Sequence, residues 1–148
     1  MYTTRNLSHS DALQVVNAIR QELERTGKGA AVAVVDAHGE LIAFLRTDGC
    51  KLPSITIAIH KAFTAAREHT ASYDVGVQSR TMPFPMTNFG DLRYVTWGGG
   101  IPIKAGDEVI GAVGVSGLAE DDDIALAQLG REGDHIISIG LLEPRQND

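Results

Sequence analysis

The sequence has few of the residues on which several common functions depend. Its 148 residues include a single cysteine, Cys50, so no internal disulfide can form, and one free thiol fits a reducing cytoplasm. The formal net charge is −6 and no run of basic residues occurs, which argues against binding to the phosphates of nucleic acids. No apolar stretch approaches the ~20 residues of a membrane span, and the N-terminus lacks the basic and apolar regions of a signal peptide. We therefore expect a cytoplasmic protein that binds neither nucleic acid nor membrane.

Length and composition predict a single globular domain over residues 1–148. A chain of this size buries roughly two-thirds of the surface that it exposes when unfolded. Apolar residues make up 43% and charged residues 22%, which is typical of soluble globular proteins. The sequence shows no internal repeat, linker or low-complexity segment that would divide it.

The first third of the chain predicts a helix followed by a β-hairpin. Ser8 is a suitable N-cap, apolar residues then recur at helical spacing, and Gly27 is a natural stop, which together predict a helix over residues 8–26. Two apolar runs at 30–35 and 40–46 flank a turn and predict two strands. Because apolar residues follow one another without alternation in both runs, we expect both strands to be buried on two faces, with helices above and below the sheet.

The remainder predicts further helices around three more strands. Pro53 begins a helix, one or two helical turns at 72–79 follow, and residues 80–90 form an irregular loop. The strand candidates are 92–96, 99–104 and 108–116, and the C-terminal helix contains Ile124, Leu126, Ala127, Leu129, Ile136 and Ile137. An acidic run at its start, residues 120–123, complements the positive end of its dipole. The order of elements predicts a three-layer α/β/α fold with a five-stranded antiparallel sheet.

Glycines concentrate between Trp97 and Gly130, which predicts that the backbone there approaches a ligand or a neighbouring segment closely. The amides of Gly98 and Gly99 would be able to receive an anion, with Trp97 as an aromatic wall. The alternative is that these glycines let strands or subunits approach each other, with Trp97 in an interface.

Three ordered segments of the chain resemble one known family. They are VVDAHGELIAFLRTDG (34–49), HKAFTAAREHT (60–70) and GGGIPIKAGDEVIGAVGVSGLAEDDDIA (98–125). Together they are similar to the GlcG/HbpS family of haem-binding-like proteins, which also includes the C-terminal domain of PduO. The resemblance covers nearly the whole chain, and it implies a profilin-like fold and assembly into a homo-oligomer.

The resemblance also implies a small-ligand-binding protein, with haem or another tetrapyrrole as the first candidate. A haem iron needs an axial ligand beside an apolar slot. His60 and His69 lie in the segment that resembles the family's functional helix, and they are the candidate axial ligands. The alternative for each is an ordinary surface or core histidine, and the low aromatic content of 5% counts mildly against a large haem pocket.

The second hypothesis is an enzyme of small organic acid metabolism: an isomerase, lyase or tautomerase acting on a carboxylated substrate. Lys61 and Arg46 would hold carboxylates, His60 or Asp48 would move a proton, and the glycine amides would stabilise an enolate. No specific acid/base motif supports this chemistry, so the sequence leaves open whether the protein is an enzyme.

Each of these polar residues also has a structural alternative. Lys61 shares a helix face with Thr64 and Arg67, on the side or flank away from the apolar stripe, and with Thr70 it matches the family motif. We therefore count Thr64 and Thr70 among the ligand candidates. Lys61 would otherwise pair with Asp48 or Glu68, and Arg46 and Asp48 would form an ion pair that locks a strand to a helix.

Overall fold

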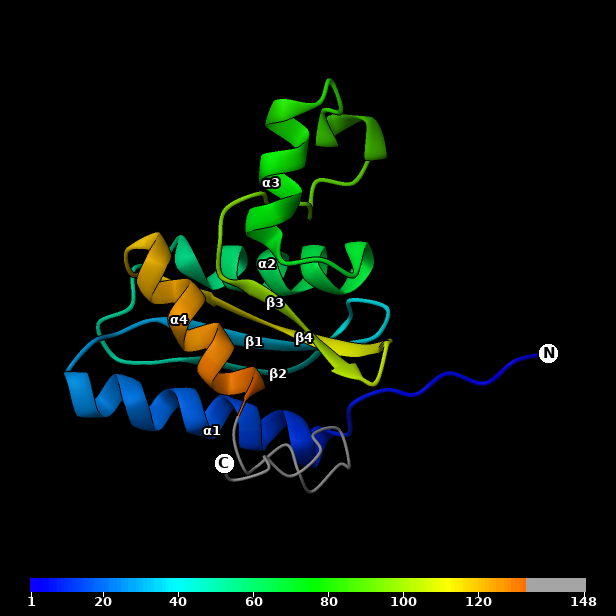
Figure 1. The fold of residues 1–148 in the computed structure, drawn as a ribbon. Coiled ribbons are helices and arrows are strands. Elements are labelled where there is room, and N and C mark those ends of the chain that lie inside the picture. Colours follow the sequence, from blue (N-terminus) through cyan, green and yellow to red (C-terminus); the bar gives the residue numbers. More distant parts are fainter. Residues whose placement is uncertain (133–148) are drawn as a thin grey trace, which may run out of the picture.

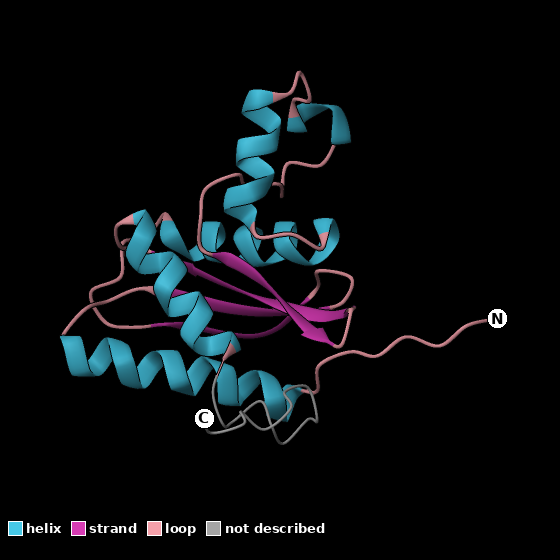
Figure 2. Cartoon of the chain, in the orientation of Figure 1, coloured by secondary structure: helices cyan, strands magenta, loops and turns pink. Residues whose placement is uncertain are grey.

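Four helices and one sheet account for most of residues 1–132, the part of the chain that the structure, a computed structural model, describes. Helices and strands are drawn in chain order in Figure 1 and by type in Figure 2. The strands are β1 (Ala31–Asp36), β2 (Leu41–Arg46), β3 (Gly100–Ala105) and β4 (Glu108–Ser116). The helices are α1 (His9–Thr26), α2 (Ser54–Glu68), α3 (Ser72–Thr81) and α4 (Glu120–Arg131), and a 3₁₀ turn, η1, spans Met86–Phe89.

The sheet is antiparallel, with the strand order β2-β1-β4-β3. The fifth strand that we expected is not confirmed, because residues 92–96 form a loop within the described part of the chain. Two backbone amides of this loop donate hydrogen bonds to side chains rather than to a neighbouring strand. Arg93 N donates to Asp91 Oδ1 at 2.9 Å, and Val95 N donates to Thr64 Oγ1 at 2.9 Å. The strands β3 and β2 are therefore the two edges of the sheet.

Helices cover the sheet on both faces, as the sequence predicts (Figure 1). Helices α1 and α4 pack on one face over a core of large apolar side chains, among them Val15, Ile19 and Val34. Helix α2 packs on the other face through alanines, and a Cβ at Gly114 would lie 2.2 Å from the carbonyl oxygen of Ala58. The small residues of β4 and α2 thus let the helix backbone approach the sheet closely.

Strand β2 is less buried than its apolar sequence suggests. We expected both of its faces to be covered, but its residues are half-buried or exposed along their whole length. Helix α1 packs against β2, whereas α2 lies mainly over β1, β3 and β4. The other edge strand, β3, is buried because both α2 and α4 pack on it, so the sparse cover of β2 by α2 explains the difference.

The ends of the helices follow the predicted signals where the structure describes them. Ser8 caps α1 by accepting a hydrogen bond from Asp11 N, and Gly27 ends the helix in the left-handed conformation at φ 68°. Within the described residues α4 ends at Arg131, and the predicted continuation through Ile136 and Ile137 lies outside them. The helices found in residues 1–132 are all too short or too polar to cross a membrane.

Candidate functional site

A buried ion pair joins the middle of α2 to the start of α4. The Lys61 side chain is 4% exposed, and its Nζ donates to the Val115 carbonyl oxygen at 2.9 Å and to Asp123 Oδ2 at 3.2 Å. Asp123 Oδ1 accepts a hydrogen bond from Leu118 N at 3.1 Å. Burial raises the pKa of the Asp123 carboxyl, although the nearby Lys61 ammonium opposes that rise. The expectation that Lys61 lies away from the buried side of its helix is therefore wrong, because α4 and β4 cover it.

A cavity of about 250 Å³ lies against this ion pair. Its rim is formed by the exposed side chains of Lys51, Trp97 and Glu120. Its volume is slightly below the ~300–1,000 Å³ of typical ligand pockets, so only a small molecule fits. The residues that line it are Lys51, Ser54, Ile57, Lys61, Trp97, Gly98, Ser116, Gly117, Leu118, Glu120 and Asp123.

The glycines beside Trp97 serve close packing. Gly98 N donates to Glu120 Oε2 at 2.9 Å, so this amide already has a partner. A Cβ at Gly99 would lie 2.4 Å from the Val115 carbonyl oxygen and 3.0 Å from Lys61 Nζ, and Gly99 has a φ of 127°. Only glycine allows the chain to pass this close to Lys61 with that conformation. The geometry thus favours the packing interpretation of Gly98 and Gly99 over an anion site.

His69 and Thr70 border a larger cavity of about 610 Å³. His69 is the C-cap of α2 and has a left-handed conformation with φ 54°, which turns the chain towards α3. The cavity follows the edge strand β3 and reaches the end of α4. Its lining consists of His69, Thr70, Ala71, Asp74, Ile101, Pro102, Ile103, Lys104, Gly106, Arg131 and Glu132.

His60 lies elsewhere on α2, half-buried near the loop that precedes β3. Burial, and then the positive charge of Arg93, lower the pKa of its imidazole. It borders neither the cavity at Lys61 nor the one at His69. Thr64, one turn further along, is buried and donates to the His60 carbonyl oxygen at 2.8 Å. Thr64 therefore holds the backbone together rather than facing a ligand.

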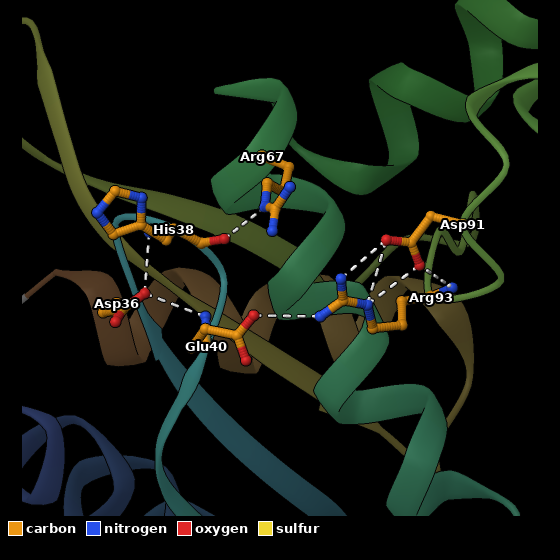
Figure 3. Close-up of polar contacts among 6 residues, drawn as sticks. All are labelled: Asp36, His38, Glu40, Arg67, Asp91 and Arg93. Carbon is orange, nitrogen blue, oxygen red and sulfur yellow. Dashed lines mark hydrogen bonds and ion pairs between the residues drawn. The ribbon is translucent and has the colours of Figure 1, made fainter.

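A network of charged residues joins the β1–β2 turn to α2 and to the loop before β3 (Figure 3). Arg93 donates to Asp91 Oδ2 at 2.8 Å and to Glu40 Oε1 at 3.2 Å, and its side-chain hydrogen bonds lower the pKa of Asp91 to about 2. Arg67 donates to the His38 carbonyl oxygen. The guanidinium carbons of Arg93 and Arg67 lie 4.0 and 4.9 Å from the centre of the Phe63 ring. The three-residue spacing of Lys61, Thr64 and Arg67 thus does not make one polar surface, since only Arg67 is exposed.

Arg46 and Asp48 lie at the end of β2, exposed, and border a third cavity of about 370 Å³ beside the end of α1. No salt bridge joins them to each other or to a helix within residues 1–132. The structure therefore places the candidates in three different cavities: Lys61 and Trp97 in one, His69 and Thr70 in another, Arg46 and Asp48 in the third.

Asp123 and Ser72 are two further residues beside Lys61 and Trp97; the sequence placed Asp123 in the acidic run at the start of a helix and did not single out Ser72. Asp123 is on the buried face of α4 together with Leu126, Ala127 and Gly130, a helical spacing that was visible in the sequence. Ser72 Oγ donates to the Trp97 carbonyl oxygen at 2.7 Å and accepts from Gly100 N at 2.9 Å. No sequence signal pointed to Ser72, because its partners are more than twenty residues away along the chain. In the described residues, no group of three or more His, Cys, Asp and Glu side chains is arranged to hold a metal ion.

Comparison with known proteins gives one consistent result. A family model described as "Haem degrading protein HbpS-like" matches residues 7–132. The protein GlcG of Escherichia coli K12 is 32% identical over 124 residues, covering 78% of this chain and 85% of GlcG. Among solved structures, that of HbpS has a TM-score of 0.79 at 27% identity and covers 88% of this chain and 91% of its own. The PduOC:heme complex has a TM-score of 0.77 at 28% identity, with 85% and 93% covered.

Proposed function

The chain belongs to the HbpS-like family, and from this premise we propose that it binds haem in the cavity of about 610 Å³ beside His69. The observation that carries the proposal is the position of this histidine at the border of a cavity whose wall is the apolar edge strand β3. The relative that is solved as a heme complex supports the choice of ligand.

The residues around the cavity have the chemistry that haem requires. Ile101, Pro102 and Ile103 belong to the lining and make this wall of the cavity apolar. An imidazole such as that of His69 is a common axial ligand of haem iron. Lys104 and Arg131 are cations that can hold the propionate carboxylates, while Asp74 and Glu132 disfavour propionates on their part of the rim. Bound haem would supply an iron centre whose reactivity this lining sets.

His69 is a better axial candidate than His60. Both are in the segment that resembles the family's central helix, but His69 borders the cavity of about 610 Å³, whereas His60 borders none of the three cavities described above. The uncharged imidazole that burial favours at His60 is able to bind a metal, yet His60 faces the Arg93–Asp91 pair rather than an apolar slot. We therefore assign His60 no ligand in this proposal.

Three observations count against the second hypothesis, an enzyme of small organic acid metabolism. Lys61 is already neutralised by Asp123, the Gly98 amide is already bound by Glu120, and Arg46 borders a different cavity. A carboxylated substrate would therefore have to replace an existing partner of Lys61 and would not reach Arg46 at the same time.

A hemin titration followed by absorbance tests the proposal. We expect a sharp Soret band that saturates at one equivalent per chain. His69→Asn should shift or abolish that band, because asparagine tolerates the left-handed backbone but does not replace the imidazole. His60→Asn is the matched control and should titrate like the wild type. A non-saturating titration, or an unchanged band in His69→Asn, would overturn the assignment.

We propose further that the protein is a homo-oligomer in the cytoplasm. Several large apolar side chains are exposed in the segment that follows α3, which supports an interface with another copy: Met82, Phe84, Phe89 and Leu92. Cys50 has no disulfide partner in the described residues, which is compatible with a reducing compartment.

A further inference from the structure

We propose that Lys61 is a nucleophile, and that it forms an imine with a small aldehyde or ketone that enters the cavity of about 250 Å³. This site is separate from the haem cavity, so the inference does not depend on the proposed function. It rests on three features of the structure: the hydrogen bonds of Lys61 Nζ, the proximity of Asp123, and free hydroxyls in the cavity wall.

The hydrogen bonds of Lys61 leave one position at its Nζ without a protein partner among residues 1–132. An ammonium has three N–H donors, whereas Nζ has two acceptors among residues 1–132, the Val115 carbonyl oxygen and Asp123 Oδ2. A neutral amine has two N–H bonds and one electron pair. With both bonds used, its electron pair is free to point towards the cavity that Lys61 borders.

Asp123 is placed to take the proton that the amine must lose. Its Oδ2 is 3.2 Å from Nζ, and both side chains are 4% exposed. In so dry a place a neutral pair competes with an ion pair, because each separated charge costs several kcal/mol to desolvate. Burial also raises the pKa of Asp123, which favours its protonated form. Enzymes that form imines use lysines withdrawn from water, and Lys61 meets that condition.

The cavity has the size and polarity for a small carbonyl compound. Its volume of about 250 Å³ corresponds to the share of roughly eight water molecules. Ser54 and Ser116 border it, are buried as residues, and their hydroxyls make no hydrogen bond to the rest of the described chain. These hydroxyls are therefore available to a carbonyl oxygen, and the exposed rim at Trp97 and Lys51 gives access.

The reaction is balanced by the two residues alone. The electron pair of Nζ attacks the carbonyl carbon and a C–N bond forms. The carbonyl oxygen takes the proton of the Asp123 carboxyl, and Nζ passes one of its own protons back to that carboxylate, which gives a neutral carbinolamine. The hydroxyl then leaves as water with the proton of Asp123, and the C=N bond forms as a protonated imine beside the Asp123 carboxylate. The net change is one water released, with no oxidation or reduction.

Reductive trapping tests this directly, because the chain has only four lysines. The native protein is exposed briefly to acetaldehyde and sodium cyanoborohydride at neutral pH, and peptide mass spectrometry measures ethylation at each lysine. Lys28, Lys51 and Lys104 are exposed and serve as internal controls. None of these three lysines has the hydrogen bond to Asp123 that Lys61 has, so Lys61 should react at least about tenfold faster than they do. Ethylation of Lys61 no faster than that of Lys28 would overturn the proposal.

The variant Asp123→Asn tests the role of the Asp123 carboxylate in this reaction. Asp123→Asn keeps an oxygen for the Leu118 amide but cannot give the leaving hydroxyl its proton, so the preferential labelling of Lys61 should fall about tenfold while Lys28 is unchanged. If this variant does not fold, the labelling of the wild type still decides the matter. His69→Asn should label like the wild type, which separates this site from haem binding.

Discussion

At the scale of single residues, burial makes the Lys61–Asp123 pair sensitive to the loss of either partner. Asp123→Ala should lower the free energy of unfolding by about 3–5 kcal/mol, because it leaves Lys61 buried without a counter-charge. Urea unfolding measures the change. Glu24→Ala removes a partner of Arg20 on the surface of α1 and should cost about 0.5 kcal/mol or less.

The double variant Lys61→Met with Asp123→Leu provides the complementary test. Replacing both buried charges by apolar groups of similar volume is often neutral or stabilising. We expect it to recover most of the stability lost in Asp123→Ala. Equal losses in Asp123→Ala and Glu24→Ala would contradict the burial of the pair.

His60 should titrate below its ordinary pKa of about 6.5, because burial and then the charge of Arg93 disfavour the imidazolium. A lowered pKa in the folded state means that His60 stabilises the fold above pH ~6.5, and that this contribution is lost as the pH falls. The titration of its imidazole by NMR gives the midpoint. Arg93→Gln should move that midpoint upwards, and an unchanged midpoint would show that Arg93 has no part in it.

At the scale of elements, the β1–β2 turn depends on a glycine that touches α2. Gly39 has a φ of 91°, and a Cβ there would lie 2.8 Å from Cδ2 of Phe63. Gly49 has a similar φ of 83° but open space around it. Gly49→Ala should therefore cost only the backbone strain of about 1 kcal/mol, whereas Gly39→Ala should cost about 2–4 kcal/mol. Thermal or urea unfolding of the two variants gives the difference, and equal losses would contradict the contact with Phe63.

Elements with local signals were predictable, and those that depend on distant partners were not. The N-cap Ser8 and the stop at Gly27 predicted α1 to within a residue, because caps act within one turn. Residues 92–96 have the composition of a strand, but the hydroxyl of Thr64 and the carboxylate of Asp91 take up backbone amides there. Thr64 lies on α2 and Asp91 directly precedes the segment. The pattern of apolar residues within 92–96 therefore could not reveal these hydrogen bonds.

At the scale of the whole molecule, the sequence motifs identify the family but not how the candidate residues group. Lys61 and Arg46 belong to motifs of the same family, yet the fold places them at different cavities. Burial of Lys61 follows from α4, which begins nearly sixty residues later in the chain. Spacing along one helix cannot reveal a carboxylate supplied by another. The structure describes residues 1–132, so a single domain spanning residues 1–148 remains a prediction.

Helix α3 and η1 project from the body of the molecule (Figure 1), and exposed apolar side chains lie in the chain that follows α3. Phe84 packs against Phe89, with ring centres 5.9 Å apart, yet Phe84 stays 60% exposed and Leu92 98% exposed. Side chains of this size in one patch are typical of an interface. We therefore expect the protein to be a homo-oligomer by light scattering.

Phe84→Ser combined with Leu92→Ser should reduce the measured mass towards that of one chain, because the patch would lose its apolar contacts. Leu13→Ser is the matched control, since Leu13 is also exposed, at 51%, but lies on α1 away from this segment. It should leave the mass unchanged. A wild type that is already monomeric, or a double variant with the wild-type mass, would show that copies of this chain do not associate through α3 and η1.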